Sequence, residues 1–254
     1  MREFGLGVNY FTQGMRLLVA PELRWLVIIP LMLNLALFVG MFYWAAGQYE
    51  ALVAWMMGWL PDWAAFLRWL LWLVYGLLAL TVFAYAFVAM ANIIGAPFYG
   101  FLSELVEKKL TGQPVEMEGG WKVLLTTVPR ALLRELQKIF YYLPRALGVL
   151  VLGLIPVMNV AAAILWFLFS SWMMTLQYVD YPADNHRLSF REMRKGISQG
   201  RVRAFGFGMP VMVASMIPVL NLVVVPAAVC GATAYWVNTK ELHQSGRLKQ
   251  PSKP

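Results

Sequence analysis

Polar side chains are rare in the long apolar segments of this chain, and those present are the first candidates for binding chemistry. Four of them are asparagines: Asn34, Asn92, Asn159 and Asn221. An amide group in hydrocarbon is costly unless it has a partner, so such residues tend to face a cavity or a neighbouring helix. We therefore predict that these asparagines line a pore or, as the alternative, form hydrogen bonds between helices.

Two of these asparagines end the same short phrase. Ile-Pro-Val-Met-Asn occupies 155–159 and Ile-Pro-Val-Leu-Asn occupies 217–221, which starts 62 residues later. Each phrase lies at the centre of a long uncharged run, where the proline marks a turn and the asparagine can cap the helix that follows. The N-terminus of that helix would also offer free N–H groups and a positive dipole end to an anion. Capping and anion contact are both compatible with this pattern.

Charged residues next to the apolar segments supply further candidates. Arg24 precedes the first long apolar run, where it is either an anchor at the membrane surface or part of an anion site at a helix N-terminus. Glu104 can pair with Arg130 or Arg134 at a cytoplasmic mouth. The alternative for these three residues is a solvated charged face.

The segment 179–186 (VDYPADNH) also contains groups that could do chemistry, namely Asp180, Asp184 and His186. Its proline, aspartates and asparagine are typical of a turn that caps the next cytoplasmic helix, which is the interpretation we favour. The sequence has no Ser/His/Asp or Cys/His arrangement, no Gly-rich phosphate loop and no metal-ligand spacing around its two histidines. We therefore predict that the protein is not an enzyme and has no metal or other cofactor.

The composition predicts an integral membrane protein. The 254 residues are 60% hydrophobic and only 13% charged, whereas a soluble domain usually carries about 25% charged residues. The mean hydropathy is +0.62. The formal charge of +8 is typical of basic cytoplasmic loops in a membrane protein, so no nucleic acid partner is expected.

Long uncharged stretches predict the elements that position these residues. Segments 25–46 and 70–91 are each long enough for one full transmembrane helix. Two later runs hold 34 uncharged residues (146–179) and 36 (204–239), too many for one span. Without the Pro-Asn turn each arm keeps about 15 residues, or ~22 Å, short of the ~30 Å hydrocarbon core. This predicts two re-entrant (hemi-penetrating) helical hairpins, with six short spans as the alternative.

The whole chain, 1–254, is thus predicted to be a single all-α membrane domain. Besides the two spans its segments are an amphipathic helix at 3–18, cytoplasmic helices within 92–143 (at 98–111 and 121–142), hairpin 1 at 144–178, a cytoplasmic segment at 180–203, hairpin 2 at 204–238 and a basic tail at 239–254. Of the 21 lysines and arginines only Arg68 lies in the connection 47–68. The positive-inside rule therefore puts both termini in the cytoplasm.

Several phrases resemble the CysZ sulfate transporter family. They are YFTQGMRLLVAPELRWLVIIPLMLN (10–34), GAPFYGFLSE (95–104), YYLPRA (141–146), ILWFLFSSWMMTLQYVDYPADNH (164–186) and MIPVLNLVVVPAAVCGATAYWV (216–237). The resemblance implies a multi-pass protein of the bacterial inner membrane that brings sulfate into the cytoplasm for cysteine biosynthesis. It also implies two full spans, two hemi-penetrating helix pairs and a homo-oligomer in the lipid bilayer.

The resemblance also implies an anion site before the first span, at a Gly-Leu-Arg-Arg type stretch. Here the stretch is Glu22-Leu23-Arg24-Trp25, in which Leu23 and Arg24 match the family. Glu22 replaces the glycine and Trp25 replaces the second arginine, which adds a negative charge and removes a positive one. The expected anion-binding residues are accordingly Leu23, Arg24 and Trp25.

Two functions from different classes fit this sequence. The first is a sulfate permease, either an anion channel or an ion-coupled transporter. The second is a membrane scaffold or regulatory subunit that transports nothing. Uptake of labelled sulfate by the purified protein in sealed vesicles distinguishes the two.

Overall fold

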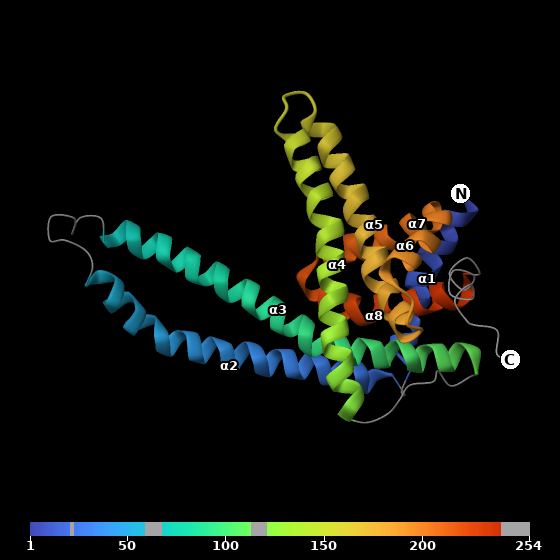
Figure 1. Cartoon of the computed structure of the whole chain (residues 1–254), viewed down its shortest axis with the longest axis horizontal. Helices are drawn as coiled ribbons and strands as arrows, with labels where there is room; N and C mark the ends of the chain where they lie inside the picture. The colour runs from blue at the N-terminus through green and yellow to red at the C-terminus, as the bar shows by residue number, and fades with distance from the viewer. Residues whose placement is uncertain (21–22, 59–67, 113–120, 240–254) are drawn as a thin grey trace. The chain divides into compact units, whose positions relative to one another are not determined.

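The computed structural model describes residues 1–20, 23–58, 68–112 and 121–239, and every regular element in these ranges is an α-helix. This confirms the predicted all-α class. The helices are α1 (Arg2–Leu18), α2 (Arg24–Met57), α3 (Arg68–Thr111), α4 (Trp121–Gly153), α5 (Asn159–Asn185), α6 (Phe190–Gln199), α7 (Arg201–Ser215) and α8 (Pro218–Asn238) (Figure 1). They form two compact units, residues 29–95 and residues 1–28 with 96–254. The predicted tail lies outside the described residues apart from Thr239.

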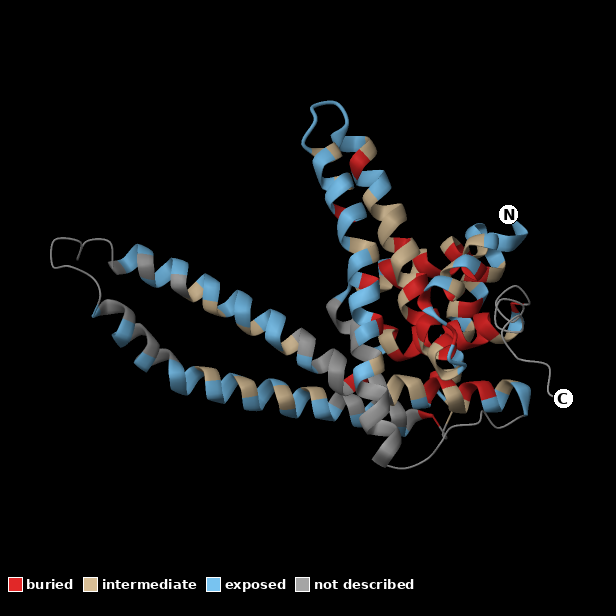
Figure 2. Cartoon of the chain, viewed as in Figure 1, coloured by how far each residue is buried: buried red, intermediate tan, exposed pale blue. Residues whose placement is uncertain are grey.

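The unit 29–95 consists of the long apolar parts of α2 and α3. Phe38 of α2 makes edge-on ring contacts with Phe83 and Phe87 of α3, with ring centroids 5.8 and 5.4 Å apart. Most other described large residues of this unit are exposed (Figure 2), among them Trp44 at 70% and Tyr85 at 74% exposure. An apolar outer surface of this kind requires a lipid environment, because water would penalise its exposure.

The second unit contains a packed core centred on α8. From Val224 to Trp236 almost every α8 residue is buried, and α1 packs across α7 and α8. A Cβ on Gly14 of α1 would lie 2.2 Å from the Ala227 carbonyl oxygen. Glycine is therefore required for this close approach. The predicted amphipathic helix 3–18 is confirmed as a helix, but its buried face is built on Gly7, Tyr10, Gly14 and Leu18.

Two helical hairpins belong to this unit. Hairpin 1 joins α4 to α5 through residues 154–158, with Val157 at a positive φ of 75°. Its tip is turned outward, with Leu154 82% and Val157 90% exposed. Hairpin 2 joins α7 to α8 through Met216 and Ile217. The first Ile-Pro phrase therefore lies at a helix turn, whereas in the second only Ile217 does, because Pro218 is already the first residue of α8. The predicted capping by Asn159 and Asn221 is wrong: the N-caps are Met158 and Ile217, and neither makes a side-chain cap hydrogen bond.

The arms of hairpin 1 are longer than the length argument assumed. α4 runs without a break from Trp121 to Gly153, so the predicted cytoplasmic helix 121–142 and the first arm are one helix that contains Pro144. α5 has 27 residues, about 40 Å at 1.5 Å per residue, and among the described residues it alone meets the length and hydropathy criteria for a membrane span. Only α7, with 15 residues, has the expected short length. A charge at the end of an apolar run does not end a helix when the charged side chain has a partner.

The predicted turn at 180–186 is wrong. α5 continues through Asn185, and the chain turns only at His186 and Arg187, where Arg187 has φ 55°. The cap of the next helix is Ser189, whose side chain accepts from the Glu192 N–H while Glu192 bonds back to the Ser189 N–H. The aspartates stay helical because they pair with cations of α4, as described below.

Candidate functional site

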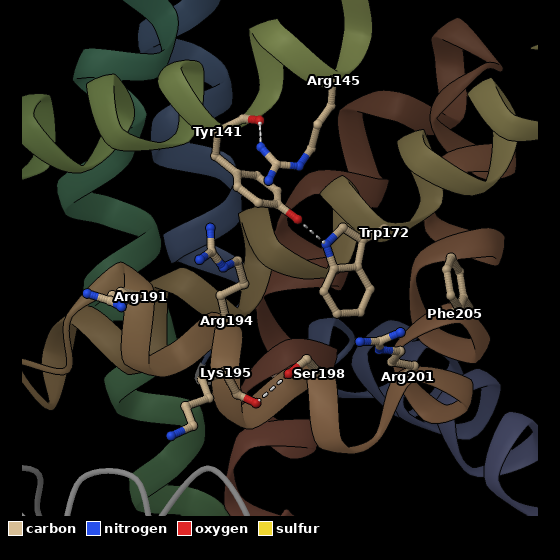
Figure 3. A pocket seen from close by; sticks show the side chains of 9 residues that line it. All are labelled: Tyr141, Arg145, Trp172, Arg191, Arg194, Lys195, Ser198, Arg201 and Phe205. Carbon is tan, nitrogen blue, oxygen red and sulfur yellow. Dashed lines mark hydrogen bonds between the residues drawn. The ribbon is translucent and has the colours of Figure 1, made fainter. Parts of the chain in front are cut away.

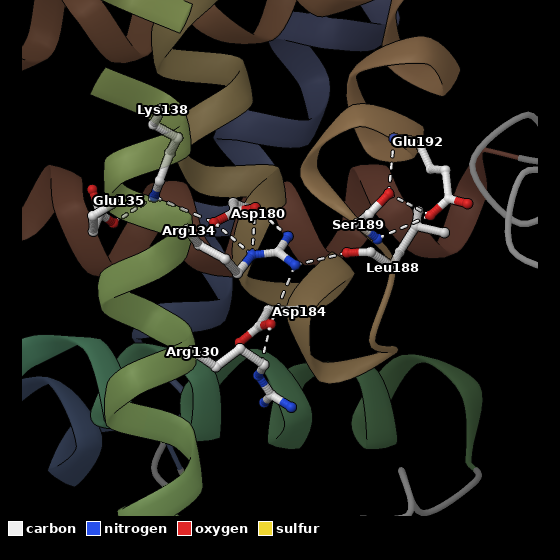
Figure 4. Close-up of polar contacts among 9 residues, drawn as sticks. All are labelled: Arg130, Arg134, Glu135, Lys138, Asp180, Asp184, Leu188, Ser189 and Glu192. Carbon is white, nitrogen blue, oxygen red and sulfur yellow. Dashed lines mark hydrogen bonds and ion pairs between the residues drawn. The ribbon is translucent and has the colours of Figure 1, made fainter. Parts of the chain in front are cut away.

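A buried ion-pair cluster joins α4 to α5, the two arms of hairpin 1 (Figure 4). Arg134 donates from Nε to both carboxylate oxygens of Asp180, at 3.1 and 3.3 Å, and from Nη1 to the Leu188 carbonyl oxygen at 2.7 Å. Its Nη1 also lies 3.3 Å from Oδ1 of Asp184. Because Arg134 and Asp180 are only 7% and 6% exposed, these bonds are shielded from water.

Two further cations of α4 complete the cluster at four-residue intervals. Arg130 Nε lies 3.1 Å from Asp184 Oδ1, and Lys138 Nζ lies 3.3 Å from Asp180 Oδ2 and contacts Glu135. Three cations thus meet three carboxylates, so the cluster has little net charge to offer an anion. Burial lowers the pKa of Arg134, but the charge and hydrogen bonds of Asp180 outweigh it and the pKa is raised. This arginine stays cationic and structural.

The end of α3 is tied to the same unit by a second polar contact. His186 Nε2 lies 2.8 Å from Glu107 Oε1, and the His186 ring stacks on Trp236 with ring centroids 5.4 Å apart. Glu104, one turn earlier, has an Oε2 that is buried without a hydrogen-bond partner among the described residues. The structure therefore brings the predicted mouth residues Arg130 and Arg134 together, but with Asp184 and not with Glu104.

The predicted anion site at 23–25 lies at the start of α2. Leu23 is buried, and its N–H donates to the Ala20 carbonyl oxygen at 3.0 Å. Trp25 is 58% exposed, whereas Glu22 and the side chain of Arg24 lie outside the described residues. Since α2 begins at Arg24, an anion at this site would lie against the N-terminal end of the helix.

The four predicted pore asparagines lie in four different helices. Asn34 of α2 is half-buried, and its Oδ1 is buried without a hydrogen-bond partner among the described residues. Asn159 is the first residue of α5, and its Oδ1 accepts from the Val160 N–H at 2.8 Å. Asn92 lies in α3 and Asn221 in the first turn of α8, and both side chains lie outside the described residues.

A cationic pocket of about 540 Å³ lies where α4, α5, α6 and α7 meet (Figure 3). Within the described part of the chain, none of its lining residues is a carboxylate. Five of its nine lining residues are cations: Arg145, Arg191, Arg194, Lys195 and Arg201. Among the described residues no ion pair joins any of these five to a carboxylate. The pocket therefore has the charge needed to bind an anion.

Aromatic rings organise the cations of this pocket. The guanidinium carbons of Arg145 and Arg194 lie 3.9 and 4.6 Å from the centroid of the Tyr141 ring. Arg145 Nη1 donates to the Tyr141 carbonyl oxygen at 2.7 Å, and Trp172 Nε1 donates to the Tyr141 hydroxyl at 3.2 Å. Cation–π contacts hold both guanidinium groups without neutralising their charge.

Sequence reasoning missed this pocket because it treated these cations as loop charges that set the topology. A signal was available in their spacing. Arg191, Arg194, Lys195 and Ser198 recur at helical intervals of three and four residues, which places them on one face of α6.

Comparison with known proteins shows what the chain resembles. The family model described as sulfate transporter CysZ/etoposide-induced protein 2.4 matches residues 10–226. The protein named sulfate transporter CysZ from Pseudomonas fluorescens (strain Pf0-1) is 43% identical over 234 residues, which cover 92% of this chain and 94% of the relative. The one from Pseudomonas syringae pv. tomato is 45% identical over 234 residues, which cover 92% of each chain. The one from Vibrio cholerae serotype O1 (strain ATCC 39315) is 43% identical over 243 residues, 94% of this chain and 96% of its own.

Proposed function

The chain belongs to the family of sulfate transporter CysZ and etoposide-induced protein 2.4, and from this premise we propose that it carries sulfate across the bacterial inner membrane into the cytoplasm. The sulfate would supply cysteine biosynthesis. The observation that carries the proposal is the alignment with relatives named sulfate transporter CysZ over more than nine-tenths of both chains. The family match over residues 10–226 includes both hairpin turns and the start of α2.

The physical features of the chain support a transporter of anions. α2 and α3 present apolar side chains outward, as a lipid-facing surface requires, and both hairpins carry uncharged turns. We place the re-entrant hairpins and the two spans in the membrane with both termini in the cytoplasm, and we expect copies of the chain to assemble as a homo-oligomer.

The proposed anion site is the start of α2. Backbone N–H groups at the start of α2 and the guanidinium of Arg24 would bind sulfate, with Trp25 beside them. Asn34, whose Oδ1 is buried without a partner among the described residues, would line the path further along α2. We propose the same role for Asn92, Asn159 and Asn221.

The charge of sulfate sets the energetics. Moving one elementary charge against 100 mV costs about 2.3 kcal/mol, so a dianion entering a negative-inside cell faces about twice that. In a channel, consumption of sulfate in the cytoplasm would offset this electrical cost. In a symporter, the gradient of a coupled ion would offset it. The two routes differ in whether an ion gradient is needed for uptake.

The experiment is uptake of labelled sulfate by the purified protein in sealed liposomes, with and without proton and sodium gradients. Uptake above that of empty liposomes is expected. Arg24→Ala should weaken sulfate binding roughly tenfold or more, because a charge-assisted hydrogen bond is worth about 1.5–3 kcal/mol. Arg16→Ala, which removes an exposed cation from α1, is the matched control and should leave binding unchanged.

Two results would count against parts of this proposal. Unchanged sulfate binding in Arg24→Ala would remove Arg24 from the site. Absence of uptake under every gradient would favour a scaffold or regulatory subunit over a transporter.

A further inference from the structure

We propose that the cationic pocket between α4, α5, α6 and α7 binds the phosphate group of an anionic phospholipid at the membrane surface. The inference uses the membrane placement of the hairpins but does not depend on sulfate transport. It rests on the charge of the pocket, its size, its aromatic lining and its place along the helices.

The lining of the pocket is strongly cationic. Five cations line the pocket and no carboxylate does, whereas the nearby cluster on the same helix α4 matches its cations with carboxylates. Like charges held this close repel one another unless a counter-ion is present. Arg145 and Arg194, held on Tyr141, present guanidinium donors that suit the oxygens of a phosphate group.

The pocket is much larger than a sulfate ion. The volume of about 540 Å³ lies within the range of roughly 300–1,000 Å³ typical of pockets that bury a drug-sized ligand. A sulfate ion has only five heavy atoms and would leave most of this space to water. A glycerophosphate headgroup has the size to reach cations on both α4 and α6.

The pocket residues stand next to the two apolar arms in the sequence. Arg145 is the last charge before the 34 uncharged residues of hairpin 1, and Arg201 and Arg203 precede the 36 uncharged residues of hairpin 2. The pocket is thus at the base of both apolar arms, where lipid headgroups would lie if the arms enter the bilayer. Basic pockets at such positions on the cytoplasmic side are typical binding sites for anionic headgroups.

Aromatic and apolar side chains lie in and near the pocket. Tyr141, Trp172 and Phe205 line it, and tyrosine and tryptophan prefer the headgroup level of a membrane. Two turns from Trp172 toward the hairpin tip, the same face of α5 carries Leu165, which is 44% exposed. A lipid with its phosphate in the pocket would have apolar side chains of this kind available for its acyl chains, which a free anion would not use.

The test measures lipid binding to the full chain, purified in detergent and freed of lipid. Dioleoyl phosphatidylglycerol is titrated against dioleoyl phosphatidylcholine, which carries no net charge, and bound lipid is counted by native mass spectrometry. We expect phosphatidylglycerol to bind at least tenfold more tightly. Arg145→Gln/Arg194→Gln should weaken phosphatidylglycerol binding tenfold or more relative to the wild type, since two of the cations that attract the phosphate are removed.

Matched variants separate the pocket from the overall charge. Arg2→Gln/Arg16→Gln removes the same charge from α1 and should keep wild-type binding. Arg191→Gln/Lys195→Gln changes two exposed pocket cations and serves as the second test if the first pair lowers the yield of folded protein. Equal loss in the α1 and pocket variants would overturn the proposal, because binding would then follow total charge.

A separate arm distinguishes a lipid from a free anion. Sodium sulfate or phosphate at 10 mM should displace little phosphatidylglycerol beyond the effect of equal ionic strength in sodium chloride. If sulfate or phosphate displaces the lipid fully while sodium chloride at equal ionic strength does not, the pocket is a free-anion site and the lipid assignment is refuted. Equal affinity for phosphatidylcholine would refute it as well.

Discussion

Replacing Arg134 by methionine is expected to be among the most destabilising single changes in the charged part of the chain. The change leaves Asp180 buried and removes its Nε donor at 3.1 and 3.3 Å. Loss of one partner of a buried ion pair costs about 3–5 kcal/mol. Lys138 Nζ stays 3.3 Å from Asp180 Oδ2 and still pairs with this carboxylate, so we expect the lower end of that range, about 3 kcal/mol. The Leu188 carbonyl also loses its donor, adding about 1 kcal/mol.

The total of about 4 kcal/mol corresponds to a fall in Tm of roughly 8–16 °C for a chain of this size. Thermal unfolding in detergent measures it. Adding Asp180→Asn to the Arg134→Met variant should recover about 1–2 kcal/mol, because no uncompensated carboxylate remains. Arg191→Met is the control: its side chain is exposed and should shift Tm by no more than about 2 °C. Equal shifts in Arg134→Met and Arg191→Met, or no recovery in the double variant, would refute the buried pairing.

Three further predictions follow from the same structure. Gly14→Ala would place a Cβ 2.2 Å from the Ala227 carbonyl oxygen and should destabilise the protein by about 1–3 kcal/mol, whereas Gly5→Ala on the same helix meets nothing within 4 Å and should not. Burial raises the pKa of Glu104, an effect that Lys108 opposes and Glu107 aids, so the folded state binds more protons than the unfolded state. Glu104→Gln should therefore have no effect on Tm well below pH 4.5, raise Tm as the pH rises through the pKa of the folded state, and give a constant gain above it. Alkaline phosphatase inserted at 59–62 should be active in cells, and the same enzyme fused after residue 254 should be inactive, as expected if only the connection 47–68 faces outward.

The linear pattern of the chain predicted much of its local structure. Apolar length and the near absence of charge indicated long helices, and the Ile-Pro phrases indicated turns at 155–159 and 217–221. Both are local properties, because a proline fixes its own φ and the length of an apolar run can be read from consecutive residues. The all-helical class and the helix at 3–18 followed from the same rules.

The continuity of the helices could not be predicted in this way. Asp180 and Asp184 are typical of turns when read alone, yet both lie inside α5 because Arg134 of α4 binds them across the interface between the helices. Their partner is more than forty residues away in the sequence. A local propensity is overridden when a tertiary contact satisfies the side chain that would otherwise compete with the backbone.

By itself, then, the sequence determined that the chain is helical and apolar enough for a membrane, and it predicted that nearly all cations lie on one side of that membrane. It could not show which cations are neutralised. Arg134 and Arg145 lie on the same helix, but only the tertiary structure decided that the first is held by carboxylates of α5 and the second lies over Tyr141 in a pocket without them. The physical reason is that charge pairing depends on separations of a few ångströms between helices distant in sequence, whereas a count of charges has no information on distance.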